Sequence, residues 1–173
     1  MIILGSFLSC KKNEPIEKAT TKKNVLTKNS KEEKEAYFFI ATSNVTKSLI
    51  AKSQLAQHKS LKNTVKEIST IIENNQNLLL HEINKEALKK LIITTEVNSN
   101  VANDDLYNLI DTTDVDFDKA YIDSIIKSLS EQIKLFESIS EETQDASILK
   151  LAIYFLPKQY ELLREAKKIQ TNL

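Results

Sequence analysis

Residues 117–139 read FDKAYIDSIIKSLSEQIKLFESI, and this stretch decides the fold class. Its large apolar side chains recur at spacings of three and four residues, which is the pattern of one helix face. These side chains are Tyr121, Ile125, Leu129, Ile133, Phe136 and Ile139. Asp116 is the predicted N-cap, and Asp118 lies in the first turn, where negative charge suits the helix dipole. The stretch therefore predicts a long amphipathic helix that begins at Phe117.

Three further segments show the same spacing of apolar side chains. The first contains Phe38, Ala41, Val45, Ser48, Leu49, Lys52, Leu55 and Ala56. The second contains Leu61, Val65, Ile68, Ile72, Asn75, Leu79, Ile83, Ala87, Leu88, Leu91 and Ile92. The last contains Ile148, Leu149, Ala152, Ile153, Leu156, Tyr160, Leu163, Ala166 and Ile169. The break at residues 57–60 predicts a short connection with Ser60 as the next N-cap, and Pro157 predicts a kink in the last helix.

Four long helices account for most of the chain, and residues 106–110 predict a short extra helix between the second and the third of them. The sequence has one Gly and two Pro, so a β-sandwich with many tight turns is excluded. Isolated helices depend on tertiary packing for stability, and a bundle buries all four apolar faces at once. We therefore expect an all-α protein, an antiparallel four-helix bundle that occupies residues 36–173.

Composition excludes several classes of function. Lys and Arg number 24 and Asp and Glu number 24, so a basic surface for nucleic acid is not expected. A single cysteine excludes an internal disulfide and a zinc ribbon. Gly5 is the one glycine, so the chain has neither a glycine-rich phosphate loop nor a Gly-x-Ser-x-Gly elbow. We expect no enzymatic activity and no cofactor.

The first ten residues read MIILGSFLSC, an apolar segment that ends at Cys10 and is followed by charged residues. This resembles the end of a bacterial lipoprotein signal peptide. The resemblance implies that residues 1–9 are a signal-peptide remnant, that Cys10 is lipidated, and that its lipid holds the chain to a membrane of the cell envelope. Lys11 is not the aspartate linked with inner-membrane retention in enteric bacteria, which favours the outer membrane. An ordinary apolar terminus with a chance cysteine is the alternative.

Residues 10–35 carry few large apolar side chains. Within them, residues 11–35 hold eight lysines and five acids, a net charge of +3. Such a segment buries too little apolar surface to offset the entropy lost on ordering. We therefore predict that residues 10–35 are a flexible tether between the lipid and the bundle.

Metal ligands are sparse in the predicted bundle. His58 falls in the predicted connection, and Leu78 stands three residues before His81, where a Glu-x-x-His ligand pair would need Glu. We therefore expect no metal site. The alternative is a metal-binding or redox protein that uses carboxylates alone, which requires at least two of its candidates to face inward together. The candidates are Glu67, Glu73, Glu82, Asp123 and Glu131.

Asn75 lies on the predicted apolar face of the second helix, and we place it at the edge of that face. A buried asparagine that sets the register of the bundle, or one that contacts a small ligand, is the alternative. The leading functional hypothesis is a lipid-anchored envelope protein whose helical bundle is a non-enzymatic binding or structural module. A third hypothesis, beside the carboxylate one, is self-association through an exposed apolar strip along residues 86–93.

Three segments together resemble a known family. They are Leu55-Ala56-Gln57 with Val65-Lys66 downstream, residues 117–123 (FDKAYID), and Leu156-Pro157. The resemblance is to the bacterial DUF4142 family, envelope proteins of unknown function predicted to form ferritin-like four-helix bundles. It covers residues 36–171.

Family members tend to carry Glu in the first helix, Asp-His in the second and His in each of the last two. Those positions fall here on Leu49, Glu73-Asn74, Leu129 and Leu162, so the resemblance does not carry metal chemistry to this chain.

Overall fold

A computed structural model describes the backbone of residues 17–94 and 100–173, and the side chains of residues 30–94 and 105–173. It contains α1 (Glu17–Lys59), α2 (Asn63–Lys89), α3 (Asn100–Asp111), α4 (Asp114–Glu142) and α5 (Ala146–Gln170). Every regular element in the described part of the chain is a helix, which confirms the prediction of an all-helical protein. None of the described helices is long and apolar enough to cross a membrane.

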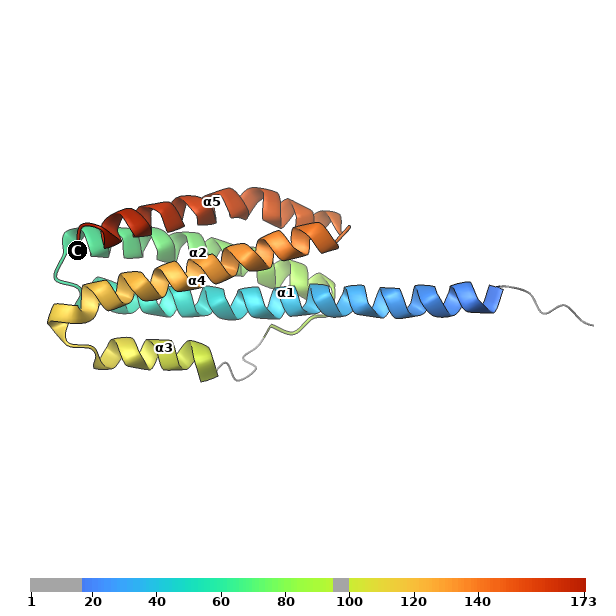
Figure 1. Cartoon of the computed structure of the whole chain (residues 1–173), viewed down its shortest axis with the longest axis horizontal. Helices are drawn as coiled ribbons and strands as arrows, with labels where there is room; N and C mark the ends of the chain where they lie inside the picture. Colours follow the sequence, from blue (N-terminus) through green and yellow to red (C-terminus); the bar gives the residue numbers. More distant parts are fainter. Residues whose placement is uncertain (1–16, 95–99) are drawn as a thin grey trace, which may run out of the picture.

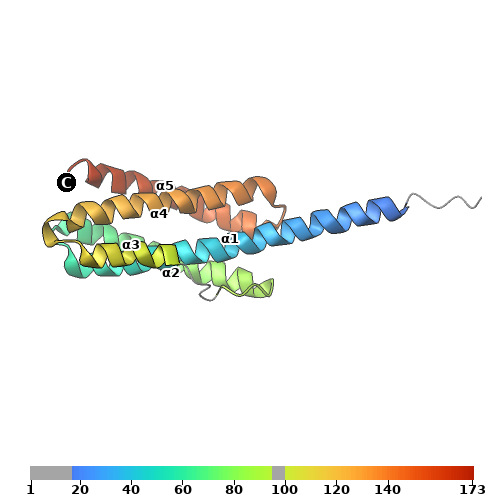
Figure 2. The ribbon, with the colours of Figure 1, turned by 60° about the horizontal axis from the view of Figure 1, so that its bottom comes forward.

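The long helices lie side by side in a bundle (Figure 1). α1 contacts α2 and α4, and α5 contacts the same two helices from the other side. The short helix α3, the predicted extra element, packs against α1 and α4. Figure 2 shows that α1 extends well past the end of every other helix.

The start of α1 corrects one prediction. We expected a flexible tether over residues 10–35, but α1 begins at Glu17, so residues 17–35 are helical. The reason is that no Gly or Pro interrupts the chain between Glu17 and Lys59, and Ala, Lys and Glu all favour helices. Residues 1–16, including the predicted signal-peptide remnant and Cys10, lie outside the described residues.

The core consists of two apolar clusters at different positions along the axis of the bundle. The first contains Val45, Leu49, Ala56, Val65, Ile68, Ile72, Leu109, Phe117, Tyr121, Ile122, Ile125, Leu129, Leu162 and Ala166. The second contains Phe38, Phe39, Leu79, Ile83, Ala87, Phe136, Ile139, Ile148, Leu151, Ala152 and Phe155. Phe38 packs edge-on against Phe39 and Phe136, with ring centroids 5.4 Å and 5.3 Å apart. Both clusters draw on all four long helices, so the core joins them into one unit.

Two predicted N-caps were wrong. Ser60 precedes α2 but does not cap it. The N-cap is Lys62, and the buried Ser60 Oγ accepts a hydrogen bond from the Lys62 N–H at 3.1 Å instead. α4 begins at Asp114 with Thr113 as N-cap, so Asp116 lies within the first turn. There Asp116 accepts a hydrogen bond from Thr113 Oγ1 at 2.9 Å.

The buried face of α5 is only partly the predicted one: Ile148, Ala152 and Ala166 are buried as predicted. Ile153 and Tyr160, which we placed on the buried face, are 78% and 46% exposed. The buried residues of α5 are Ile148, Leu151, Ala152, Phe155, Gln159, Leu162 and Ala166. Pro157 lies inside α5 as predicted, and the helix is visibly bent (Figure 1). Since α5 is apolar on two neighbouring faces, it buries one of them and leaves the other partly exposed.

α2 ends in an unusual way. Leu91 has φ of 58°, in the left-handed region that favours glycine. The Ile92 N–H bonds to the Ala87 carbonyl and the Leu91 N–H to the Leu88 carbonyl, which is the Schellman pattern of a helix end. Leu91 is 88% exposed, so burial of its side chain does not compensate for the strained backbone.

We expect Leu91→Gly to raise the free energy of unfolding by about 1 kcal/mol, because glycine adopts this conformation without the steric cost that leucine bears. Urea unfolding of both proteins measures the difference. Leu88→Gly is the matched control: Leu88 is also well exposed, at 73%, but lies within the helix, where glycine destabilises. A loss of stability in Leu91→Gly would contradict this account of the helix end.

Candidate functional site

A layer of polar side chains crosses the bundle between the two apolar clusters. Gln132 Nε2 of α4 donates to Thr46 Oγ1 of α1 at 2.8 Å and to Gln76 Oε1 of α2 at 2.9 Å. Gln76 Nε2 in turn donates to Gln159 Oε1 of α5 at 2.8 Å. All four side chains have an exposed fraction of 0%. We call these four residues the glutamine layer, and it links all four long helices.

The glutamine layer is not fully satisfied. Gln132 Oε1 and Gln159 Nε2 have no hydrogen-bond partner among the described atoms. Nearby on α1, the buried hydroxyls of Thr42 and Ser43 are also unpaired within the described part of the protein. The layer therefore offers amides and hydroxyls. None of these groups titrates near neutral pH, so they are unsuited to general acid–base catalysis.

The five candidate carboxylates do not converge. Glu67, Asp123 and Glu131 are exposed. The partly exposed Glu73 accepts from Gln54 at 2.7 Å and from Gln57 at 2.6 Å on the outer side of α1 and α2. Glu82 binds Lys85 of its own helix at 2.9 Å. Over the described residues, no three His, Cys, Asp or Glu side chains form a group that could hold a metal ion. The carboxylate alternative therefore has no support in the described fold.

The other polar residues singled out in the sequence lie at the surface. His58 is exposed, and the His81 side chain is 73% exposed. Asn75 lies at the edge of the buried face of α2, as predicted, and donates to the Ile71 carbonyl. The buried polar residue of α2 is its neighbour Gln76, which we did not predict. Gln76 follows Ile72 by four residues and precedes Leu79 by three, so its spacing was the available signal.

Three of the positions aligned with the family's histidines and glutamate are apolar and buried, and the fourth, Asn74, is exposed. Leu49, Leu129 and Leu162 are buried together in the first apolar cluster. Glu73, the one retained acid, is on the outer side of α2 and is bonded to glutamines of α1. The polar layer of this protein therefore lies beside those three leucines and is built from different positions.

Lys52 of α1 is a second buried polar group. Its side chain is 1% exposed, and its Nζ donates to Ser128 Oγ at 3.1 Å. Its counter-ion is Asp105 of α3, with Oδ2 at 3.4 Å. Burial lowers the pKa of Lys52 below its ordinary value, although Asp105 acts in the opposite direction. The contact ties α3 to the bundle, and Lys59 adds hydrogen bonds to the carbonyls of Ile110 and Thr112.

An ion-pair cluster closes the end of the bundle beyond which α1 extends. Lys90 Nζ lies 3.1 Å from Glu35 Oε2 and 2.6 Å from Asp145 Oδ2. Thr143 Oγ1 donates to the other oxygen of Glu35 at 2.8 Å. Asp145 is also the N-cap of α5 and accepts from the backbone of Ser147 and Ile148. The cluster joins α1, the end of α2 and the start of α5.

Hydrogen bonds from Lys90 and then Ser147 hold the pKa of Asp145 well below its usual range. A depressed carboxyl pKa gives stability that is present above the unfolded value, about 3.9, and is lost as pH falls below it. We expect Asp145→Asn, which keeps a capping acceptor, to cost about 1–2 kcal/mol at pH 7. Urea unfolding at a series of pH values should show that the difference in free energy of unfolding between the parent and Asp145→Asn becomes smaller below about pH 4. A difference that does not change with pH would contradict the electrostatic account.

A groove of about 690 Å³ lies between α2 and α5 at the same end of the bundle. Its apolar lining comes from Leu78, Leu151, Ile153, Tyr154 and Phe155. Its charged lining comes from Glu82, Lys85, Glu86, Lys89 and Lys150. Unlike the glutamine layer, this surface is open to solvent.

Comparison with known proteins places the chain in a family. The model of a domain of unknown function (DUF4142) matches residues 18–169. The chain belongs to the DUF4142 family. The match confirms the resemblance seen in the sequence, and it begins at residue 18, so the DUF4142 domain includes most of the segment that we had predicted as a tether. No curated protein and no solved structure gave a match.

Proposed function

We propose that this DUF4142 protein is a lipid-anchored protein of the cell envelope, and that its helical bundle is a non-enzymatic binding or structural module. The observation that carries the proposal is the glutamine layer. A catalytic or metal-binding bundle places titratable side chains at its centre. The centre of this bundle holds Thr46, Gln76, Gln132 and Gln159, all fully buried.

We further propose that α1, α2, α4 and α5 form an antiparallel four-helix bundle of the ferritin type, with α3 added on one side. The order of contacts supports this arrangement. Along α1 and α4, Phe38 meets Phe136 and Ser53 meets Tyr121, as expected for two helices that run in opposite directions. Along α2 and α5, Gln76 meets Gln159 while Lys90, just after α2, meets Asp145, just before α5.

The anchor is proposed to be lipid on Cys10, in the outer membrane and facing the periplasm or the cell surface. The apolar residues that end at Cys10 and the charged residues that follow it support this proposal. The geometry of α1 is compatible with it, because Glu17 lies at the far end of a helix that extends away from the bundle (Figure 1). A lipid at that end would leave the bundle surface accessible to a partner.

Metabolic labelling with a radioactive fatty acid tests the anchor. We expect label in the protein expressed in a bacterial host, and none in Cys10→Ser, which is the matched control since it is the one cysteine of the chain. Label that persists in Cys10→Ser, or its absence from both proteins, would refute the anchor.

Metal analysis of the purified protein after exposure to iron, manganese and zinc tests the non-enzymatic module separately. Stoichiometric bound metal would refute it.

A further inference from the structure

The groove between α2 and α5 exposes three large apolar side chains. Ile153 is 78% exposed, Tyr154 is 54% exposed and Leu78 is 43% exposed. Leu151 and Phe155, which line the same groove, are buried and continue into the second apolar cluster. A volume of about 690 Å³ falls within the range of small-molecule sites, about 300–1,000 Å³. The groove is therefore large enough and apolar enough to take up a hydrocarbon chain.

The charges around the groove are almost balanced within α2. Lys85 binds Glu82 at 2.9 Å, and Lys89 binds Glu86 at 2.6 Å. Lys150 of α5, on the opposite wall, makes no ion pair with any described residue. Counting three lysines against two glutamates leaves a net charge of +1 for the lining. The groove thus combines an apolar surface with one ammonium group whose charge is not neutralised.

We propose that this groove binds a long-chain fatty acid, with its carboxylate at Lys150 and its hydrocarbon chain along Leu78, Ile153 and Tyr154. The inference rests on the proposed binding function and names its ligand class. An ammonium–carboxylate contact beside buried hydrocarbon uses both features of the groove. A partner helix or a second copy of this chain would bring several charges, whereas the groove has one charge left to neutralise. A ligand with one negative charge matches it.

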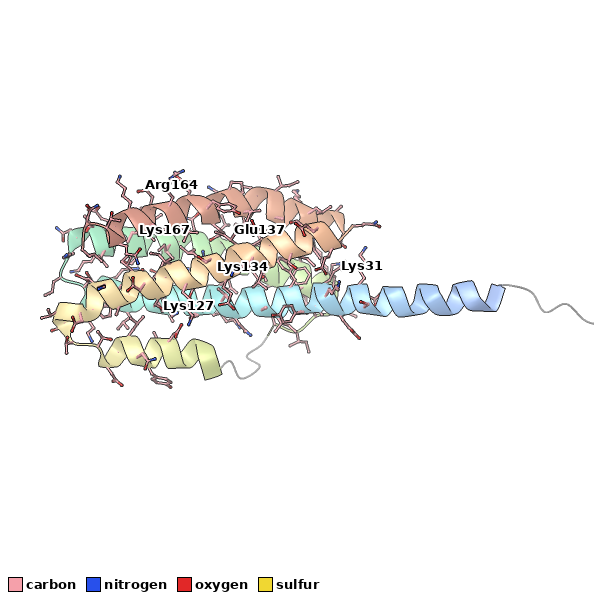
Figure 3. The ribbon with its side chains drawn as sticks, viewed as in Figure 1. Lys31, Lys127, Lys134, Glu137, Arg164 and Lys167 are labelled. Carbon is pink, nitrogen blue, oxygen red and sulfur yellow. The ribbon has the colours of Figure 1, made fainter. Side chains whose placement is uncertain are left out.

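Titration with cis-parinaric acid, a fatty acid that fluoresces in apolar surroundings, tests the proposal. All proteins are full-length chains that carry Cys10→Ser, so that no covalent lipid competes for the groove. We expect saturable binding of one molecule per chain. Lys150→Glu should weaken it at least tenfold, because it replaces attraction for the carboxylate by repulsion. The matched control is Lys134→Glu, an exposed lysine of α4 (Figure 3), which should bind as the parent does.

Two further measurements separate the carboxylate from the chain. The methyl ester of parinaric acid should bind at least tenfold more weakly than the acid to the parent protein, and Lys150→Glu should not weaken it further. Ile153→Asp should also weaken binding of the acid at least tenfold, and its circular dichroism should match the parent because Ile153 is exposed.

Absence of saturable binding, equal losses in Lys150→Glu and Lys134→Glu, or equal affinity for acid and ester would overturn the proposal. So would light scattering that shows a dimer which Ile153→Asp converts to a monomer, because a second copy would then occupy the groove. None of these results depends on acylation of Cys10. Fatty-acid label on Cys10 of the parent, together with no parinaric acid binding by the Cys10→Ser protein, would therefore refute this inference and leave the proposed anchor intact.

Discussion

Gln132→Leu is expected to lower the free energy of unfolding by about 2–3 kcal/mol, although it replaces a polar side chain by an apolar one in the core. Gln132 Nε2 is the donor for both Thr46 Oγ1 and Gln76 Oε1, and all three side chains are fully buried. Its removal leaves two buried acceptors without that donor, at about 1–3 kcal/mol for each buried group left unsatisfied. Urea unfolding followed by circular dichroism, with linear extrapolation, measures the loss.

The triple variant Gln76→Leu/Gln132→Leu/Gln159→Leu should recover most of that loss. Replacing a whole buried polar group by apolar side chains is often neutral or stabilising, whereas removing one partner is not. Gln144→Leu is the matched control, since Gln144 is exposed and should change stability by less than about 0.5 kcal/mol. If the triple variant loses three times as much as Gln132→Leu, the glutamines act independently and the layer is not a network.

The burial of the glutamine layer could not be predicted from the helical pattern of apolar residues. Leu129 and Phe136 were correctly predicted to be buried, and Gln132 lies between them at spacings of three and four residues. A hydrophobicity pattern assigns glutamine to the surface because most glutamines are exposed. Whether a glutamine on such a face is buried depends on which side chains of the other helices lie at the same position along the bundle axis. That requires the tertiary arrangement, which one sequence does not contain.

The orientation of α5 could not be predicted for a related reason. Leu149, Ile153 and Leu156 form one apolar series, and Leu151, Phe155 and Leu162 form another with helical spacing on a different face of the helix. Periodicity predicts a helix from either series but cannot choose between them. The second series is the buried one. Ile153 of the first series is therefore left exposed and lines the groove. The apolar face that misled the prediction is thus part of the proposed binding surface.

The helices themselves were predictable because the chain contains few residues that break them. Four long helices and one short helix were expected, but α1 begins at Glu17, inside the predicted tether, and α3 is longer than the expected helix over residues 106–110. The boundaries were less predictable. Ser60 and Thr113 each bond to a neighbouring residue of their own turn, and such local contacts decide where a helix begins.

Asp105→Asn is expected to lower the free energy of unfolding by about 2–3 kcal/mol, the second large effect, because it leaves the Lys52 ammonium without its counter-ion. Lys52 is 1% exposed, and an asparagine at position 105 offers its Nζ only a neutral amide oxygen, beside Ser128 Oγ at 3.1 Å. Breaking a buried ion pair by removing one partner is costly since the remaining charge stays out of water. Urea unfolding at neutral pH measures the loss.

Lys52→Met made in the Asp105→Asn background should restore most of the stability, because it removes the buried charge and keeps the length of the side chain.

The sign of the pH dependence of stability gives an independent check. Burial lowers the pKa of Lys52 in the folded state, so the folded chain binds fewer protons than the unfolded chain as pH approaches about 10.5. The contribution of Lys52 to stability therefore rises with pH in that range, and Lys52→Met abolishes the rise. The matched control is Lys127→Met: Lys127 faces the same oxygen of Asp105 at 3.4 Å but is 67% exposed. If Lys127→Met restores the Asp105→Asn protein as well as Lys52→Met does, the loss does not come from a buried charge on Lys52.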